Sequence, residues 1–257
     1  MIALIDADTL AYQAAVAVEN PIKWDDDLWT LHAYESDAVV KFVDHLNSIL
    51  EKVGTSEYVL TFSDSENWRK EVLPTYKANR SGTRKPMVLK ALREWAMETH
   101  PYEMCPTLEG DDVLGILATG KKYKPGEVVI CSLDKDFKTI PGRHYNFGRD
   151  EFFNIDTDQA RYWHMMQTLT GDSTDGYAGC PGCGPKTAEK ILGSLDPREY
   201  WKGVVKAYAA AGLCEDEALV QARVARICWA SDYDFKKKQV KLWNPPATNK
   251  LLATITG

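Results

Sequence analysis

The stretch Val128-Val-Ile-Cys-Ser-Leu-Asp134-Lys-Asp136 decides the fold, because a short run of apolar residues leads directly into two aspartates. A run of this length and composition is typical of a buried strand in a parallel sheet. The first residues of the chain, Met1-Ile-Ala-Leu-Ile-Asp6, have the same arrangement. Residues just past the carboxyl ends of parallel strands converge on one crevice, so these segments predict a shared site built from acids.

Helical and strand patterns alternate through the first 155 residues. Tyr58 to Phe62 reads as another strand after a helix that begins near Ser36, whereas Asn20 to Leu28 reads as an acidic connection. Further helices are expected at residues 86–99 and from about Glu109. The alternation predicts an α/β fold with a parallel sheet covered by helices. Beyond residue 155 the expected segments are helical, at 157–169, 187–192, 198–211 and 216–230.

Composition and charge set limits on the class of protein. The 257 residues are 44% hydrophobic and 26% charged, which is ordinary for a globular protein. Six cysteines at irregular spacing, the lack of a signal peptide and the lack of an 18-residue apolar run predict a cytoplasmic protein without disulfides or membrane contact. The net charge of −6 is unusual for a nucleic-acid binder, so the distribution of charge matters more than its total.

Nine carboxylates from five separate segments end or follow short apolar runs. Such a cluster repels itself unless cations lie between the acids. Hard divalent ions such as Mg²⁺ are the natural partners of clustered carboxylates, and phosphoryl transfer is their commonest use there. The nine expected metal ligands are Asp6, Asp64, Glu109, Asp111, Asp112, Asp134, Asp136, Asp172 and Asp175.

Each acidic motif taken alone has a simpler interpretation. Glu109 and Asp112 are one helical turn apart, but three acids at this position also suit the positive end of a helix dipole. The Asp134-Lys-Asp136 pair and the Gly-Asp172-Ser-Thr-Asp175-Gly segment could each be an ordinary turn. The metal hypothesis therefore depends on all the segments meeting at one place.

Two further features indicate phosphate binding. A basic stretch between Asn67 and Arg93 has a single acid, Glu71; a solvated helix face is the alternative for it. A glycine hairpin from Gly179 to Gly184 leads into a helix, where backbone N–H groups suit a phosphate and Lys186 adds charge. Its Cys-x-x-Cys pair has no second pair of ligands nearby, so we interpret both cysteines as small loop residues. The basic residues of the stretch are Arg69, Lys70, Lys77, Arg80, Arg84, Lys85, Lys90 and Arg93.

The whole series of motifs, taken in order, resembles the flap endonuclease / 5′-3′ exonuclease family, and within it the phage-encoded 5′-3′ exonucleases. The resemblance implies a PIN-like α/β core at residues 1–155 with a helical arch at about 67–100. It also implies a helix-three-turn-helix DNA-binding subdomain at 156–257, whose C-terminal tail returns to the core. The motifs are Phe62-Ser-Asp64, Trp68-Arg-Lys, Tyr76-Lys77-Ala-Asn-Arg80, Leu-Glu109-Gly-Asp-Asp112, Asp134-Lys-Asp136-Phe, Gly-Asp172-x-x-Asp175-Gly and Gly-Pro-Lys186-Thr-Ala.

The implied activity is metal-dependent hydrolysis at 5′ ends, nicks and short flaps of duplex DNA, with RNA primers in RNA–DNA hybrids as a further substrate. The implied cofactors are two or more Mg²⁺ ions, with Mn²⁺ as a substitute, and a K⁺ ion at the hairpin; no small-molecule cofactor is implied. By position, Asp6, Asp64, Glu109 and Asp111 resemble the first metal site and Asp134, Asp136, Asp172 and Asp175 the second, with Asp112 between them.

The resemblance also assigns the basic residues. Tyr76, Lys77 and Arg80 match the base of the arch, which contacts the scissile phosphodiester. DNA contacts are expected from Arg69, Lys70, Arg84, Lys85, Gly182, Gly184, Lys186, Thr187 and Lys190.

The chain departs from the family pattern in three places. Gly176-Tyr177 replaces an Asn-Ile pair, Cys183 replaces an apolar hairpin residue, and the arch segment Ser81 to Met87 is short. The short arch favours cutting from ends and nicks over cleavage of long flaps.

Three other functions remain open from the residues alone. They are a PIN-type ribonuclease, a phosphatase of the haloacid dehalogenase type suggested by Asp6-Ala-Asp8-Thr9, and a DNA-binding module without catalysis. The helical region after residue 155 argues against the first, and the phosphatase motif needs its threonine one position later.

Overall fold

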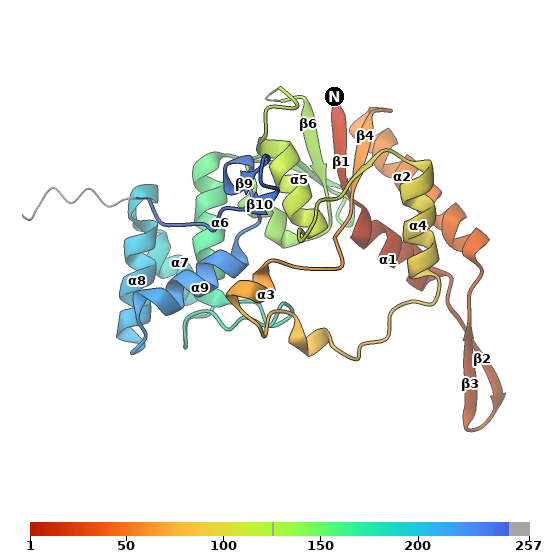
Figure 1. Cartoon of the computed structure of the whole chain (residues 1–257), viewed down its shortest axis with the longest axis horizontal. Helices are drawn as coiled ribbons and strands as arrows, with labels where there is room; N and C mark the ends of the chain where they lie inside the picture. The colour runs from red at the N-terminus through yellow and green to blue at the C-terminus, as the bar shows by residue number, and fades with distance from the viewer. Residues whose placement is uncertain (125, 247–257) are drawn as a thin grey trace, which may run out of the picture.

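A six-stranded sheet forms the centre of the computed structural model, which describes residues 1–124 and 126–246 (Figure 1). The first five strands in the order β5-β4-β1-β6-β7-β8 are parallel, and β8 is antiparallel to β7. The predicted α/β class and parallel sheet are thus observed. The strands are β1 (Ile2–Asp6), β4 (Tyr58–Thr61), β5 (Tyr102–Glu103), β6 (Val128–Cys131), β7 (Gly142–Asn146) and β8 (Glu151–Ile155).

Helices cover both faces of this sheet because its central strands are apolar on both sides. The helices are α1 (Ala7–Ala17), α2 (Glu35–Val53), α4 (Leu89–Thr99) and α5 (Gly110–Thr119). On one face, Ala3 and Ile5 belong to a core cluster with residues of α1, α2 and α4. On the other face, Leu4 and Ile130 pack with Leu114 of α5.

The strand register brings the ends of β1, β4 and β6 to the same edge of the sheet. Ile5 pairs with Leu60 on one side and with Cys131 on the other. Asp6 and the loops that follow Thr61 and Cys131 therefore begin at neighbouring points, as the predicted crevice requires.

An antiparallel hairpin stands where the sequence predicted only an acidic connection. It consists of β2 (Asn20–Asp25) and β3 (Leu28–His32), and it projects from the body beside α1 and α2 (Figure 1). Trp24 donates an indole hydrogen bond to Thr30 Oγ1 at 2.7 Å across the hairpin. Its strands are almost fully exposed, so the alternating burial that reveals a strand is missing.

The expected arch runs from α3 (Arg69–Val72) to α4 along the lower edge of the molecule in Figure 1. Between these helices the chain is irregular apart from a short 3-10 helix at Ala78–Arg80. The arch is therefore less helical than the resemblance implied.

Four helices after the sheet form a second cluster with its own core. They enclose Leu169, Leu192, Val204 and Tyr208, all of which are buried. The helices are α6 (Thr157–Thr170), α7 (Pro185–Leu192), α8 (Tyr200–Ala210) and α9 (Glu215–Ala225).

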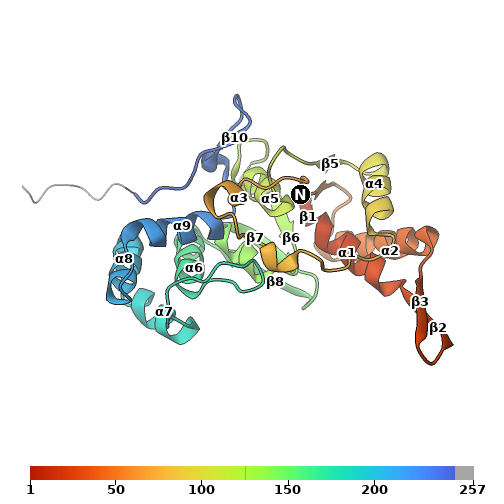
Figure 2. The same ribbon diagram turned by 60° about the horizontal axis from the view of Figure 1, so that its bottom comes forward.

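The chain then returns to the α/β part. Ile227 packs with Leu114, and Cys228 packs with Val113, on the face of α5. The small strands β9 (Tyr233–Asp234) and β10 (Gln239–Val240) follow beside α5 (Figures 1 and 2). The last part of the expected C-terminal tail, residues 247–257, lies outside the described residues. Within residues 1–124 and 126–246, no helix has the length and apolar character needed to cross a membrane.

Candidate active site

Asp6, at the end of β1, connects two neighbouring strand ends. Its Oδ1 accepts a hydrogen bond from the backbone N–H of Thr9 at 3.1 Å, so it caps α1. Its Oδ2 accepts one from Ser132 Oγ at 2.8 Å, and the same hydroxyl accepts from the N–H of Asp134 at 3.1 Å. Burial raises the pKa of Asp6 to about 6.

The N-terminus of α5 brings two more acids to Asp6. Glu109 is the residue before the helix, and Asp111 lies in its first turn. Burial, followed by the charges of Asp6 and Glu109, raises the pKa of Asp111 well above its ordinary value. A carboxylate that is partly withdrawn from water and lies among other carboxylates needs a cation to remain ionised.

The loop after β6 supplies the Asp-x-Asp pair. Asp134 Oδ1 accepts a hydrogen bond from the N–H of Asp136 at 2.8 Å and so caps the short 3-10 helix Lys135–Thr139. Asp136 Oδ1 is buried, and no residue in the described part of the chain hydrogen-bonds to it. Burial and the charge of Asp134 raise the pKa of Asp136 to about 7.

The second helical cluster contributes Asp172 and Asp175 from the loop after α6. Asp172 Oδ1 accepts a hydrogen bond from the N–H of Thr174 at 2.8 Å. Asp172 Oδ2 lies 3.3 Å from Nζ of Lys135 in the Asp-Lys-Asp segment, and the charges of both carboxylates add to the raised pKa of Asp136. Gly171 makes the turn possible, because its φ is +66° and a Cβ there would lie 2.4 Å from the carbonyl carbon of Ala178.

The base of the arch lies between the two groups of acids. The Tyr76 hydroxyl is 2.7 Å from Asp175 Oδ2 and 3.0 Å from Glu109 Oε2. Lys77 forms ion pairs with both of these carboxylates, and Arg80 Nη2 lies 2.5 Å from Asp175 Oδ1. The structure therefore brings all three expected catalytic residues to the place where core acids and helical-cluster acids meet.

Asp112 was predicted to be a metal ligand, and the structure corrects this prediction: its carboxylate is paired with Arg69 in the interior. Its carboxylate is fully buried, and Arg69 binds both oxygens at 2.7 and 2.8 Å. The Trp68 indole and the N–H of Cys228 donate further hydrogen bonds to it at 3.0 Å. Arg69, 2% exposed, is likewise corrected, because a buried arginine committed to Asp112 cannot contact DNA.

Asp64, in the loop after β4, accepts two backbone hydrogen bonds. Its oxygens accept hydrogen bonds from the N–H groups of Ser65 and Thr107, both at 2.7 Å. These bonds lower its pKa and connect the loop after β4 to the loop before α5. Asp64 therefore holds these two loops together, and its role as a metal ligand stays a prediction.

Asp8 is a site residue that the sequence analysis missed. It lies on the first turn of α1, accepts a hydrogen bond from the N–H of Ser63 at 2.7 Å and pairs with Arg93 Nε at 3.0 Å. Burial raises the pKa of Asp8, and the charge of Glu109 adds to the shift. The signal was present, because Asp6-x-Asp8 repeats the spacing of the pair after β6.

The expected DNA contacts differ in how accessible they are. The five in the hairpin and α7 are exposed, and Lys70 and Lys85 of the arch are exposed as well. Arg84 is exposed but forms a two-point ion pair with Glu19 at 2.6 and 2.7 Å. The five hairpin and α7 residues are Gly182, Gly184, Lys186, Thr187 and Lys190.

The site suits divalent cations although its acids are not yet arranged around one. In residues 1–124 and 126–246, no group of three or more His, Cys, Asp and Glu side chains already forms a ligand set. Lys77, Arg80 and Lys135 instead lie among the carboxylates and neutralise some of them. The carboxylate of Asp111, whose pKa is raised, and the buried Asp136 oxygen without a hydrogen-bond partner still need positive charge nearby. Hard cations that bind oxygen ligands can supply it.

Comparison with known proteins decides the family. Residues 1–160 match the model of the 5′-3′ exonuclease N-terminal resolvase-like domain. The chain belongs to the 5′-3′ exonuclease family. It is 33% identical to the exodeoxyribonuclease of Enterobacteria phage T3, over 95% of this chain and 93% of that protein. It is 31% identical to the exonuclease of Escherichia phage T7 over the same shares of the two chains.

Other members of the 5′-3′ exonuclease family match in part. Flap endonuclease Xni of Shewanella oneidensis is 31% identical over 50% of this chain and 54% of its own length. The fold resembles that of the T5 D15 protein co-crystallised with metal ions, with a TM-score of 0.60, 16% identity and coverage of 87% of this chain and 88% of that one. The predicted family, PIN-like fold and nuclease class are confirmed.

Proposed function

We propose that this exonuclease hydrolyses phosphodiesters at 5′ ends, nicks and short flaps of duplex DNA, using divalent metal ions. The observation that carries the proposal is that Tyr76, Lys77 and Arg80 all contact Asp175 of the helical cluster. Tyr76 and Lys77 also contact Glu109 of the core. Basic residues at the base of the arch, held between two groups of acids, are suited to binding a phosphate next to divalent ions.

We assign Mg²⁺ as the ion, with Mn²⁺ as a substitute. One group of proposed ligands is Asp6, Asp64, Glu109 and Asp111, and the other is Asp134, Asp136, Asp172 and Asp175. Support comes from the burial of Asp111 and from the partnerless oxygen of Asp136. When bound, the ions supply positive charge to the attacking water and to the leaving oxygen.

Lys77 and Arg80 then act on the substrate. Both pair with carboxylates of the site, Lys77 with Glu109 and Arg80 with Asp175. With divalent ions held by these carboxylates, Lys77 and Arg80 would be available to stabilise charge that develops on the transferred phosphate. Tyr76 is 2% exposed, so its role is to orient Glu109 and Asp175.

We assign the hairpin and α7 to the duplex. Gly182 and Gly184 have open space where a Cβ would be, so backbone and phosphate can approach each other closely. Lys186, Thr187 and Lys190 are exposed on the first turns of α7 and add charge and a hydroxyl donor. A K⁺ ion at the hairpin carbonyls belongs to this proposal, as does cleavage of RNA primers in hybrids.

The two proposed activities, cleavage and DNA binding, belong to successive parts of the chain. Residues 1–155 form the nuclease core with the arch, and residues from 156 onward form the DNA-binding part. We propose the host cytoplasm as the place of action, in keeping with the phage relatives and with six free cysteines.

The test is cleavage of 5′-labelled duplex, nicked, short-flap and RNA-primed DNA, with Mg²⁺ and with EDTA. Metal-dependent release of short 5′ products from ends or nicks is the expected result. Cleavage of single-stranded RNA alone would favour a PIN-type ribonuclease. Binding of junctions without any cleavage would favour a DNA-binding module.

A further inference from the structure

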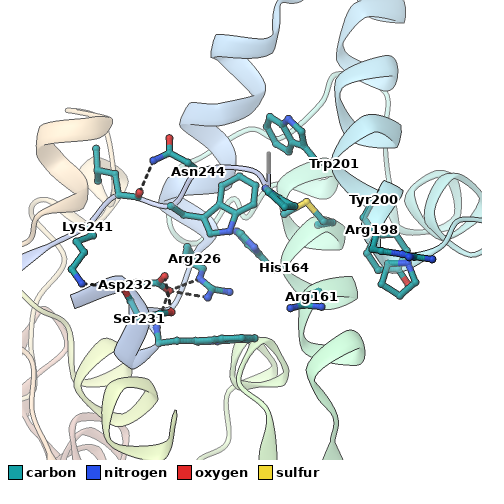
Figure 3. A pocket seen from close by; sticks show the side chains of 16 residues that line it. Arg161, His164, Arg198, Tyr200, Trp201, Arg226, Ser231, Asp232, Lys241 and Asn244 are labelled. Atoms are coloured by element: carbon teal, nitrogen blue, oxygen red, sulfur yellow. Dashed lines mark hydrogen bonds and ion pairs between the residues drawn. The ribbon is translucent and has the colours of Figure 1, made fainter. Parts of the chain in front are cut away.

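A cavity of about 500 Å³ lies between the helical cluster and the returning C-terminal segment, and none of the acids assigned to the active site is among its described lining residues. Side chains of α6, of α8 with the turn before it, and of the returning C-terminal segment line it (Figure 3). Cavities of this size hold small ligands or parts of larger ones. None of the roles assigned above uses it.

The lining is strongly basic although the whole chain is acidic. Arg161, Arg198, Arg226 and Lys241 line it, whereas Asp232 is the single acid among the described lining residues. Arg226 pairs with Asp232 at 2.8 Å, so the remaining three cations give the cavity its charge.

These three cations are available to an anionic ligand. Arg161 and Arg198 are exposed and pair only with acids of their own turns, Asp158 and Asp196. Exposed pairs of this kind contribute little and exchange readily for a better partner. Among the described residues no carboxylate pairs with Lys241, whose Nζ lies 3.4 Å from the carbonyl oxygen of Ser231.

Aromatic rings form much of the remaining wall, and hydrogen bonds fix them. Trp229 donates its indole N–H to the carbonyl of Thr139 at 2.9 Å, and Trp201 donates its own to Glu215 at 2.9 Å. Trp243 packs edge-on against Trp201, with ring centroids 5.3 Å apart. Rings that are already held in place can stack on a ligand at low entropic cost.

The arrangement of the cations distinguishes between possible ligands. Lys241 lies on one side of the hollow and Arg161 and Arg198 lie on the other, with Arg226 between them (Figure 3). One phosphate cannot reach both sides, whereas successive phosphates of a strand can. Basic side chains interleaved with aromatic rings are typical of sites for single-stranded nucleic acid, in which bases stack and phosphates pair with cations.

We propose that this cavity binds a short single-stranded segment of DNA, with its phosphates on Lys241, Arg161 and Arg198 and a base against the tryptophan rings. The proposal rests on the proposed function, since it gives a second contact to the same DNA substrate. The cavity is joined to the active site through Arg226, whose carbonyl accepts a hydrogen bond from Arg69 at 2.6 Å. Arg69 in turn donates to Glu109 at 3.0 Å.

The test uses fluorescence anisotropy with a labelled hexathymidylate strand, in EDTA so that no cleavage occurs. The cavity variant is the double substitution Arg161→Gln with Lys241→Gln. Its matched control is Lys236→Gln with Lys237→Gln, two exposed lysines of the β9–β10 turn that do not line the cavity. All four positions are exposed, so melting curves of both variants should match that of the wild type.

We expect the cavity variant to bind the strand about tenfold more weakly and the control to stay within about twofold. The plot of log affinity against log salt should be shallower in the cavity variant, with the magnitude of its negative slope smaller by about 1.4, because two phosphate contacts are lost. A hexamer of abasic sites should bind the wild type about tenfold more weakly than hexathymidylate, since it keeps the phosphates and lacks the stacking bases.

Equal weakening in both variants, or equal binding of the abasic strand, would overturn the proposal. Tighter binding of a hexa-aspartate peptide than of hexathymidylate would overturn it in favour of an acidic protein partner. Because binding is measured in EDTA, its result is independent of whether the protein cleaves DNA. Failure of the cavity and failure of the proposed function are therefore distinguishable.

Discussion

Arg69 and Asp112 form a two-point ion pair in the interior, with Nη1 2.7 Å from Oδ2 and Nη2 2.8 Å from Oδ1. The pair joins α3 at the start of the arch to the first turn of α5. Arg69 also donates to the carbonyls of Val224 and Arg226, so the same side chain connects the end of α9. One buried charge pair thus fixes the arch, the core and the helical cluster relative to each other.

Replacing Asp112 by Ala should destabilise the protein strongly, because it leaves the Arg69 guanidinium buried without its partner. The expected loss in the free energy of unfolding is about 3–5 kcal/mol. Urea denaturation in EDTA measures it, with Asp111→Ala as the matched control one residue away. We expect the control to be at least as stable as the wild type, since removing Asp111 relieves repulsion from Asp6 and Glu109. Equal stability of the two variants would contradict the assignment of Asp112.

The raised pKa of Asp136, about 7, predicts a pH dependence of stability in the metal-free protein. Its folded-state pKa lies above the unfolded value, so the stability it contributes is complete below about pH 4 and is lost as pH rises through 7. Relative to the wild type, Asp136→Asn should therefore gain stability between pH 4 and 8, with its melting temperature several degrees higher at pH 8.

Comparison of variant and wild type in EDTA isolates this effect from the buried histidines. Burial lowers the pKa of His144 to about 4 and that of His164 to about 3, and these groups favour folding at higher pH in both proteins. A difference in melting temperature that does not change with pH would contradict the role given to Asp136.

Divalent ions should stabilise the folded protein because they bind acids that only folding brings together. Melting curves in EDTA and in several millimolar Mg²⁺ should differ by about 2–3 kcal/mol of stability once the ion exceeds its dissociation constant a hundredfold. The combined variant Asp134→Ala with Asp136→Ala should lose most of this difference. An unchanged melting curve of the wild type would be evidence against a metal site at these residues.

Lys77→Ala and Arg80→Ala should each lower kcat by about 10²–10³-fold, because each removes a charge that stabilises the reacting phosphate. The affinity for duplex DNA should change much less, since we propose that most phosphate contacts are made by the hairpin and α7. Lys85→Ala, an exposed lysine of the same arch, is the control. Steady-state cleavage of a nicked duplex, combined with binding in EDTA, separates the two effects. A parallel loss of binding and turnover would assign Lys77 and Arg80 to DNA binding alone.

The strands that deliver acids could be predicted from the sequence because burial on both faces makes them continuous apolar runs. The segments around Asp6 and Asp134 combined such a run with the acid that follows it, and both were placed correctly. The exposed hairpin β2–β3 and the last two strands of the sheet, β7 and the edge strand β8, were missed. Their residues are largely exposed or mixed, so no periodic apolar pattern marks them.

The limits of the site prediction have a similar physical cause. Asp111 and Asp112 are neighbours, but a helix turns about 100° per residue, so one faces the acids and the other faces the interior. Only the packing of α3 against α9 reveals which acid meets Arg69. The Asp6-x-Asp8 spacing was visible in the sequence, but the contacts of Asp8 were not, because its hydrogen bond with Ser63 joins segments 55 residues apart.

The measurement that tests the central claim most directly is cleavage and binding of the same nicked duplex by wild type, Asp134→Ala and Asp136→Ala in Mg²⁺. We predict that both variants fold, bind the duplex as tightly as the wild type and release no 5′ products. Retention of Mg²⁺-dependent cleavage by either variant, or loss of duplex binding in parallel with activity, would contradict the account.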